Sequence, residues 1–193
     1  MKLNQQRVIL TGAAGGMGSI LAGLIVEAGA QVALVDANAD ALEDLASRLK
    51  GSHAIPGNLS SQAGCSEAIK NSIDAMGGVD VLINLAGLMS FCTYEDESLD
   101  RVQLLMQVNL IAPMLLSRVV LPELLAQGKG QIVNVGSMFG SIGFPYFTAY
   151  SASKFGLRGF SQALRRELAD APVEVTYVSP RAVKTPINTG PIV

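Results

Sequence analysis

The sequence predicts an α/β protein in which about six parallel strands form one doubly wound sheet flanked by helices. Two observations favour this class. Strand-like apolar runs alternate with helical patterns along the whole chain, and these runs lack the polar–apolar alternation of a half-exposed sheet. The chain has 193 residues, without an evident linker, repeat or low-complexity segment. This length suits one well-packed domain, so we expect residues 1–193 to form a single domain.

Each expected strand is a short apolar run, and each expected helix carries apolar residues at helical spacing. The expected strands are Arg7–Thr11, Gln31–Asp36, His53–Asn58, Val79–Asn84, Gln131–Val135 and Val173–Val178. The expected helices are Gly16–Ala28, Ala39–Leu49, Gln62–Met76, Leu99–Ala126 and Ala149–Ala169. In such a sheet, residues at the carboxyl ends of the strands meet at one edge, where ligands bind.

A glycine-rich turn, Gly12–Gly18, follows the first strand and precedes a helix, a second strand and Asp36. Glycines let backbone N–H groups approach a pyrophosphate, and the helix N-terminus adds positive potential. Asp36 can accept hydrogen bonds from the ribose hydroxyls of NAD and repels a 2′-phosphate. The turn contains no Lys or Arg, and Ala37 follows Asp36. The pattern therefore predicts a dinucleotide site that prefers NAD(H) to NADP(H).

A second pattern joins Tyr150 and Lys154, four residues apart on an expected helix, with Ser137 after an expected strand. Positions i and i+4 share a helix face, so the phenol and the ammonium can point at one spot. A nearby cation lowers the pKa of a phenol, which makes the pair a plausible general acid/base. The hydroxyl of Ser137 could hold a substrate oxygen beside Tyr150. Without further context, a helix face with a snorkelling lysine is the favoured explanation of the pair.

Pro113 lies four residues after Asn109, inside an expected helix. Proline has no N–H to donate to the carbonyl of residue i−4, so the carbonyl of Asn109 should be free at a kink to bind a water molecule. A proline kink without a function is the alternative.

Together, these motifs resemble those of the short-chain dehydrogenase/reductase family, which has a Rossmann-type fold. The resemblance runs from about Arg7 to Pro186. The matching motifs are Thr11-Gly12-x-x-x-Gly16-x-Gly18, Asn84-Leu85-Ala86-Gly87 with Leu85 in place of an Asn, Asn109, the trio Ser137, Tyr150 and Lys154, and Pro180 to Pro186 with Arg181 in place of a Gly.

The resemblance implies an NAD(H)-dependent oxidoreductase that transfers a hydride between the nicotinamide and a secondary alcohol or ketone. Tyr150 would be the general acid/base, and Ser137 would orient and polarise the substrate oxygen. Lys154 would hold the nicotinamide ribose and lower the pKa of Tyr150, while Asn109 would support a water chain. The implied cofactor contacts are Thr11, Gly12, Gly16, Met17, Gly18, Asp36, Asn58, Leu59, Asn84, Ala86, Gly87, Tyr150, Lys154, Pro180, Val183 and Thr185.

Two further segments bear on ligands. Asn58 stands where the family often has an Asp that holds the adenine amino group; its amide oxygen could do the same, or it is only a turn residue. Between Ser137 and Tyr150 lies an aromatic-rich segment, from which we expect an apolar pocket for a hydrophobic alcohol or ketone. Its expected lining residues are Met138, Phe139, Phe144 and Phe147, and Ser90–Thr93 is another candidate wall. Packing in the core or at a subunit contact is the alternative.

Composition excludes several other classes. A net charge of -2 gives no reason to expect nucleic acid. With one histidine, His53, and two cysteines, Cys65 and Cys92, we expect no disulfide framework, metal site or histidine triad. The first residues lack an apolar signal segment, and no run looks long enough to span a membrane, so a reduced cytoplasmic setting is expected.

The resemblance also bears on assembly and on the end of the chain. In the family, the helices that correspond to Leu99–Ala126 and Ala149–Ala169 usually pair across a two-fold axis, which implies a homodimer or homotetramer. Relatives usually continue with a substrate-covering segment, further helices and a last strand, so residues 186–193 would be the start of an incomplete substrate loop. Three explanations stay open: a fragment, a naturally short member with an open site, or a non-catalytic NAD(H)-binding sensor or partner subunit.

Overall fold

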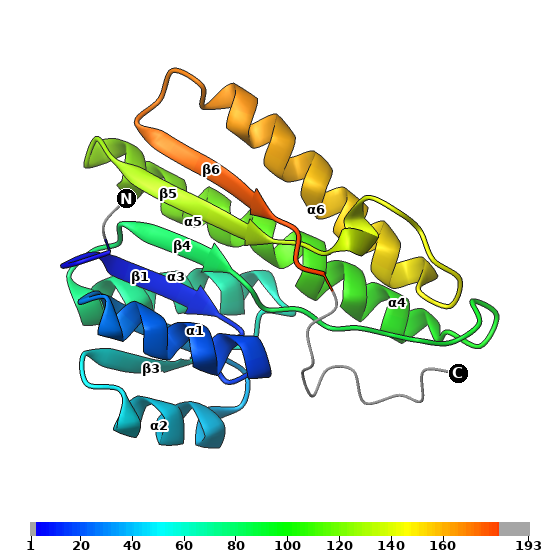
Figure 1. The fold of residues 1–193 in the computed structure, drawn as a ribbon, viewed down its shortest axis with the longest axis horizontal. Coiled ribbons are helices and arrows are strands. Elements are labelled where there is room, and N and C mark those ends of the chain that lie inside the picture. Colours follow the sequence, from blue (N-terminus) through cyan, green and yellow to red (C-terminus); the bar gives the residue numbers. More distant parts are fainter. Residues whose placement is uncertain (1–2, 182–193) are drawn as a thin grey trace.

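The computed structural model describes residues 3–181, and its core is one six-stranded parallel sheet between two layers of helices (Figure 1). The strand order is β3-β2-β1-β4-β5-β6, so the chain starts in the middle, winds to one edge, and then crosses over to build the other half. The predicted doubly wound sheet is therefore confirmed. The strands are β1 Arg7–Thr11, β2 Gln31–Asp36, β3 Ser52–Pro56, β4 Val81–Asn84, β5 Gly130–Val135 and β6 Val173–Val178.

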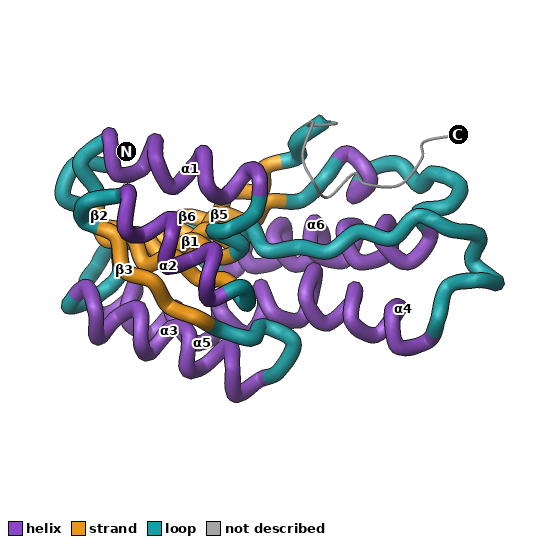
Figure 2. Tube along the Cα trace, turned by 90° about the horizontal axis from the view of Figure 1, so that it is seen from below, coloured by secondary structure: helices purple, strands orange, loops and turns teal. Residues whose placement is uncertain are grey.

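Helices cover the two faces of the sheet unequally (Figure 2). One face packs against α1 and α2, and the other packs against α3 and α5, with α6 alongside. The helical segments are α1 Gly16–Glu27, α2 Ala39–Arg48, α3 Gln62–Met76, α4 Leu99–Met106, the π-helical η1 Gln107–Ile111, α5 Ala112–Ala126, the 3-10 helical η2 Met138–Gly140 and α6 Thr148–Glu167.

Element boundaries differ from the prediction by a few residues, with local causes. The third strand was expected to reach Asn58 but ends at Pro56, which has no N–H for the ladder. Asn58 therefore lies in the following loop. The first helix ends one residue before Ala28, and Gly29 follows in the left-handed region at φ +84°.

The predicted helix Leu99–Ala126 is one continuous helical stretch with a π-helical turn in the middle. This turn, Gln107–Ile111, contains Asn109 and ends just before Ala112 and Pro113. A proline that cannot donate to residue i−4 favours such a local change of hydrogen bonding. The irregularity expected at Asn109 is thus present as a π-helical turn.

One segment bears on the expectation about membrane-spanning runs. The helical stretch Leu99–Ala126 is long and apolar enough to cross a membrane by length and composition alone, and 39% of its most apolar window is buried. The core helix of a water-soluble protein meets the same criteria. Here α5 packs on the sheet through Leu116, Val120 and Leu124, which are fully or almost fully buried. This packing accounts for the apolar composition of that half of the stretch.

Candidate functional site

The glycine-rich turn approaches neighbouring backbone too closely for side chains. Gly12 has φ +69°, and a methyl group on it would lie 2.7 Å from the Cα of Ala86. A methyl group on Gly18 would lie 2.1 Å from the carbonyl oxygen of Gly12. The turn therefore folds tightly between the end of β1, the start of α1 and the segment after β4. Such a turn exposes backbone N–H groups at a helix N-terminus, the arrangement that binds a pyrophosphate.

Thr11 fixes the position of this turn through its hydroxyl group. Its hydroxyl donates to the carbonyl of Ile83 at 3.3 Å and accepts from the N–H groups of Leu85 at 3.0 Å and Ala86 at 3.1 Å. Its exposed fraction is only 1%, and it does not line the cavity in front of the turn. Its hydroxyl therefore joins β1 to the loop after β4, and a contact of Thr11 with the cofactor stays a prediction.

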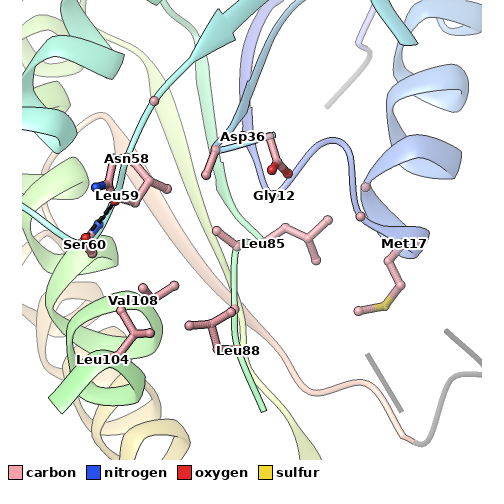
Figure 3. A pocket seen from close by; sticks show the side chains of 17 residues that line it. Gly12, Met17, Asp36, Asn58, Leu59, Ser60, Leu85, Leu88, Leu104 and Val108 are labelled. Atoms are coloured by element: carbon pink, nitrogen blue, oxygen red, sulfur yellow. Dashed lines mark hydrogen bonds between the residues drawn. The ribbon is translucent and has the colours of Figure 1, made fainter. Parts of the chain in front are cut away.

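A cavity of about 450 Å³ opens in front of the glycine turn, at the carboxyl ends of β1, β2 and β4 (Figure 3). Its size and place suit part of a bound nucleotide. The predicted cofactor residues that line it are Gly12, Gly16, Met17, Gly18, Asp36, Asn58, Leu59, Ala86 and Gly87. Sequence reasoning missed Leu88, Leu104 and Val108, which also line it, because their apolar pattern is the same as that of core residues.

Asp36 faces the cavity and also fixes the turn. One carboxylate oxygen accepts from the N–H of Ala14 at 3.1 Å, and the other accepts from the N–H of Asn38 at 3.1 Å. A carboxylate has about four acceptor positions, so ribose hydroxyls could still be bound. No Lys or Arg lines this cavity among the residues that the structure describes. The charge balance thus disfavours a 2′-phosphate.

Two predicted asparagines have other partners. The amide oxygen of Asn58 accepts from both the N–H and the hydroxyl of Ser60, at 2.9 and 2.7 Å, which occupies its acceptor positions (Figure 3). Asn58 lines the cavity, but the proposed contact of this oxygen with adenine is disfavoured. Asn84 is 1% exposed, does not line the cavity, and donates to Asn134 at 2.8 Å and Ser117 at 3.4 Å. Its amide nitrogen thus ties β4 to β5 and α5, and its contact with a cofactor stays a prediction.

Lys154 of α6 is a buried cation between the cavity and Tyr150. Its exposed fraction is 4%, and its Nζ donates to the carbonyl of Val135 at 3.4 Å. Nζ lies 5.8 Å from the ring centroid of Tyr150, and a methyl group on Gly87 would lie 3.4 Å from Nζ. Burial lowers the pKa of Lys154 from 10.5 to about 8. The i, i+4 geometry predicted for the pair is therefore present, beside a glycine that lines the cavity.

Tyr150 has a pKa above its ordinary value, contrary to the prediction. Burial raises the pKa of the phenol, the Ser137 hydroxyl works against that rise, and the phenol of Tyr177 adds to it. The predicted net lowering by Lys154 is wrong for this structure, because desolvation of the phenolate is the largest effect.

Ser137 is held by the local backbone and by an unpredicted tyrosine. Its Oγ caps η2 by accepting from the N–H of Phe139 at 3.2 Å, and its carbonyl accepts from the hydroxyl of Tyr177 at 3.5 Å. Tyr177 occupies a slot that two glycines leave open: methyl groups on Gly136 and Gly140 would lie 2.1 and 2.6 Å from its Oη. The two glycines beside Ser137 were the only sequence signal for this contact.

Asn109 connects the loop after β4 to α6. Its side chain accepts from the N–H of Leu88 at 2.8 Å and donates to the carbonyl of Leu88 at 2.9 Å and to the hydroxyl of Ser153 at 3.0 Å. It is fully buried. The π-helical turn aims this side chain between the cavity and the helix that carries Tyr150 and Lys154.

Aromatic rings surround one side of Tyr150. The ring centroid of Tyr150 lies 6.0 Å from that of Phe139 and 6.3 Å from that of Phe147, and those two phenylalanines lie 4.7 Å apart. Phe144 lies 4.9 Å from Phe139, and Phe91 lies 4.9 Å from Phe147. The predicted residues thus form one cluster, to which the segment Ser90–Thr93 contributes Phe91. Met138 is half-buried at its start.

Of the last predicted cofactor segment, only Pro180 is described. Its carbonyl accepts from the N–H of Met138 at 3.2 Å, which places it beside the segment after Ser137. Val183, Thr185 and residues 186–193 lie outside the described residues. Within residues 3–181, no three His, Cys, Asp or Glu side chains are grouped so that they could hold a metal ion.

The chain matches the family model described as short chain dehydrogenase over residues 6–190. It is 37% identical over 180 residues to a 2-dehydro-3-deoxy-L-rhamnonate dehydrogenase (NAD(+)) of Sphingomonas sp., covering 93% of this chain and 72% of the relative. It is 34% identical to the ketoacyl reductase HetN of Nostoc sp., covering 92% and 63%. It covers 60% of the mouse dehydrogenase/reductase SDR family member 7B, so it spans between 60% and 72% of the length of these three relatives.

Two solved structures have closely similar folds. A short chain dehydrogenase/reductase from Burkholderia phymatum in complex with NAD superimposes with a TM-score of 0.93 at 24% identity, covering 97% of this chain and 69% of that chain. A 3-ketoacyl-(acyl-carrier-protein) reductase from Brucella melitensis complexed with NADH gives a TM-score of 0.92 at 27% identity, covering 96% and 78%.

Proposed function

The chain belongs to the short-chain dehydrogenase family, and from this premise we propose that it is an NAD(H)-dependent oxidoreductase that interconverts a secondary alcohol and a ketone. The observation that carries the proposal is the burial of Lys154. An ammonium that is 4% exposed, with a carbonyl at 3.4 Å as its hydrogen-bond partner, is unfavourable for folding. This ammonium lies between a tyrosine and a cavity that suits part of a nucleotide, and a buried charge at such a position is typical of a functional site.

Three features support NAD(H) as the cofactor. The glycine turn leaves room for a pyrophosphate, Asp36 faces the space where a ribose would lie, and the described lining has no basic side chain for a 2′-phosphate. The relative that is 37% identical is named as NAD(+)-dependent, and the Brucella structure contains NADH. Gly12, Gly16, Met17 and Gly18 would hold the pyrophosphate side, and Lys154 would hold the nicotinamide ribose.

Residues of α6 and of the loop after β5 would carry out the proton transfer to and from the substrate oxygen. The bound nicotinamide supplies the acceptor or donor of the hydride. Tyr150 accepts the hydroxyl proton of the alcohol in oxidation and returns it to the carbonyl oxygen in reduction. Ser137 accepts from Phe139, so its own O–H proton is available to donate to the substrate oxygen. Lys154 favours the charged form of Tyr150 at the moment of transfer.

We extend the proposal to the setting of the enzyme. An apolar substrate fits the rings beside Tyr150. Pairing of α4 and α6 across a two-fold axis fits their exposed apolar side chains, which include Leu99 and Phe155 at 80% and 43% exposure. A reduced, cytoplasmic compartment fits the free Cys65 and Cys92. Size-exclusion chromatography with light scattering tests the oligomer.

The test begins with the affinity for NADH and NADPH, measured by fluorescence of the reduced cofactor. We expect NADH to bind at least about tenfold more tightly than NADPH, because Asp36 would face the 2′-phosphate. Asp36→Asn keeps an oxygen for the N–H of Ala14, gives up the contact with the N–H of Asn38 and removes the charge, so it should narrow the ratio of NADH affinity to NADPH affinity. Equal affinities in the wild type would contradict the assignment of Asp36.

The second step separates an enzyme from a pure binder. Tyr150→Phe should lower kcat by about 10²-fold or more and leave NADH affinity within about twofold, because only the proton-transferring hydroxyl is lost. NADH binding without turnover of any alcohol or ketone would favour a non-catalytic sensor. Absence of NADH binding would refute the cofactor assignment itself.

A further inference from the structure

Two loops far apart in the sequence form one wall beside the proposed reaction site. The loop after β4 carries Phe91, and the loop between η2 and α6 carries Tyr146 and Phe147. The N–H of Cys92 donates to the carbonyl of Tyr146 at 3.1 Å, and the ring of Phe91 lies 5.5 Å from that of Tyr146 and 4.9 Å from that of Phe147. The two loops are therefore joined by both backbone and rings.

Glu97 holds the residues on each side of Phe91. One carboxylate oxygen accepts from the hydroxyl of Ser90 at 2.7 Å, and the other accepts from the thiol of Cys92 at 3.3 Å. Arg101 adds a third restraint, since its guanidinium donates to the carbonyl of Met89 at 2.6 Å. We call Ser90, Cys92 and Glu97 the carboxylate clamp. Such a set of contacts fixes a loop whose tip would otherwise move easily.

The wall presents rings rather than charges. The carboxylate of Glu97 and the guanidinium of Arg101, which lies in α4, already have partners in the loop after β4. The charged group described beside Tyr150 is Lys154, whose Nζ lies 5.8 Å from the ring centroid, and the proposed function assigns this ammonium to the nicotinamide ribose. Phe91, Phe139 and Phe147 form a row of tilted rings with centroids 4.7 to 4.9 Å apart. An additional flat ring can join such a row with favourable edge-to-face contacts.

We propose that Phe91 is a specificity-determining residue that favours substrates with an aromatic ring next to the reacting carbon, and that Glu97 is the positioning residue that holds it. The inference rests on the proposed function for the chemistry, but the ring-binding wall is a property of the described residues alone. This inference goes beyond a generally apolar pocket, because a planar ring is the group that is recognised and Phe91 is the side chain that recognises it.

The experiment compares four ketones in the full chain with NADH: acetophenone, cyclohexyl methyl ketone, butanone and pyruvate. Phe91→Ala should lower kcat/KM for acetophenone by about tenfold, mainly through KM, since an aromatic pair is lost. The value for butanone should change by less than about twofold. Compared with Phe91→Ala, Phe91→Leu should have a higher activity with the cyclohexyl ketone but not with acetophenone. This difference separates recognition of an aromatic ring from recognition of any apolar group.

The clamp is tested in the same assay. Glu97→Ala should shift the acetophenone-to-butanone ratio in the direction of Phe91→Ala although Glu97 touches no substrate, whereas Cys92→Ser, which keeps a donor, should leave it unchanged. The matched control is Tyr94→Ala. Tyr94 lies in the same loop, is 61% exposed and has no ring neighbour among the described residues, so its removal should not affect the ratio.

A binding measurement keeps the two proposals distinguishable. Ligand-observed NMR of phenylethanol with Tyr150→Phe and NAD(H) reports binding without turnover, and adding Phe91→Ala should weaken it by about tenfold. If no ketone is reduced but this weakening is seen, the proposed function fails and the ring site stands. If phenylethanol binds equally with and without Phe91, or if pyruvate is the preferred ketone and Arg181→Ala abolishes that preference, the ring site is refuted.

Discussion

The half of the site that surrounds the cavity is built from backbone, whereas the half that surrounds Tyr150 is built from side chains. In the first half, Gly12 and Gly18 allow chain segments to touch, and Asp36 binds backbone N–H groups of its neighbours. In the second half, Lys154, Asn109 and the ring cluster meet from four separate segments. The first half has almost no room for added atoms, whereas the interactions of the second half depend on the burial of its side chains. The two halves should therefore fail in different ways when they are changed.

The largest effect is expected in the backbone-built half. Gly18→Ala places a methyl group 2.1 Å from the carbonyl oxygen of Gly12 and 2.8 Å from the Cα of Ala13, where only backbone can move. We expect a loss of about 3 kcal/mol in the free energy of unfolding, because overpacking against backbone has no cheap relaxation. Urea denaturation measures the stability, and NADH fluorescence measures the expected loss of binding.

Gly23→Ala is the matched control, since both glycines lie in α1. Nothing lies within 4 Å of a methyl group at Gly23. Alanine there should stabilise the protein by up to about 1 kcal/mol through helix propensity. If Gly18→Ala were as stable as Gly23→Ala, the close approach described for the turn would be wrong.

The next effect concerns burial in the side-chain-built half. The pKa of Lys154 is lowered to about 8, so below that pH the folded protein holds a charged ammonium that the unfolded chain would leave in water. Between about pH 8 and 10.5 the unfolded lysine still binds a proton that the folded one has lost, so stability rises with pH across this window. Lys154→Met should remove this dependence.

The variant should be more stable than the wild type by up to about 3 kcal/mol below pH 8, with the difference shrinking as the pH approaches 10.5. Urea denaturation at several pH values measures it. In Lys70→Met, at an exposed position of α3, the difference from wild type should stay flat over the same range, because the side chain is in water in both states. A flat difference for Lys154→Met as well would mean that its ammonium is not desolvated. If Lys154→Met is more stable than the wild type but has lost turnover, the lysine contributes to catalysis at the expense of stability.

The same contrast explains which parts of the site could be predicted from sequence. The strand, glycine turn, helix, strand and acid of the first thirty-six residues follow local rules, so β1 and β2 were predicted to the residue and Asp36 does face the cavity. The doubly wound parallel sheet followed from the alternation of strands and helices. Helix and strand ends were less certain because they depend on single residues such as Pro56 and Gly29.

Side-chain roles were predicted less well, because sequence spacing says nothing about partners that are distant along the chain. The hydroxyl of Thr11 and the amide nitrogen of Asn84 lie at the expected edge of the sheet, yet both are hydrogen-bonded to other protein groups. The pKa of Tyr150 depends on burial, which the motif alone does not contain. Tyr177 reaches the site from β6, a segment in which no sequence pattern indicated a functional residue.

Tyr177 provides the smallest and sharpest test of this last point. Gly136→Ala places a methyl group 2.1 Å from the Oη of Tyr177, and we expect it to destabilise the protein by about 1–2 kcal/mol because the ring must leave its slot. Gly143→Ala, in the loop that follows, has nothing within 4 Å of its added methyl group and should be close to neutral.

Because the clash involves one identified side chain, its removal should cancel the effect. In a double-mutant cycle, Gly136→Ala should cost little in the Tyr177→Ala background, with a coupling of about 1 kcal/mol or more between the two positions in urea denaturation. Additive effects would mean that the glycine serves the backbone of Ser137 and not the tyrosine. Coupling would show that β6 positions Ser137 through a side chain, so that even the part of the site closest to a recognisable motif depends on a residue outside it.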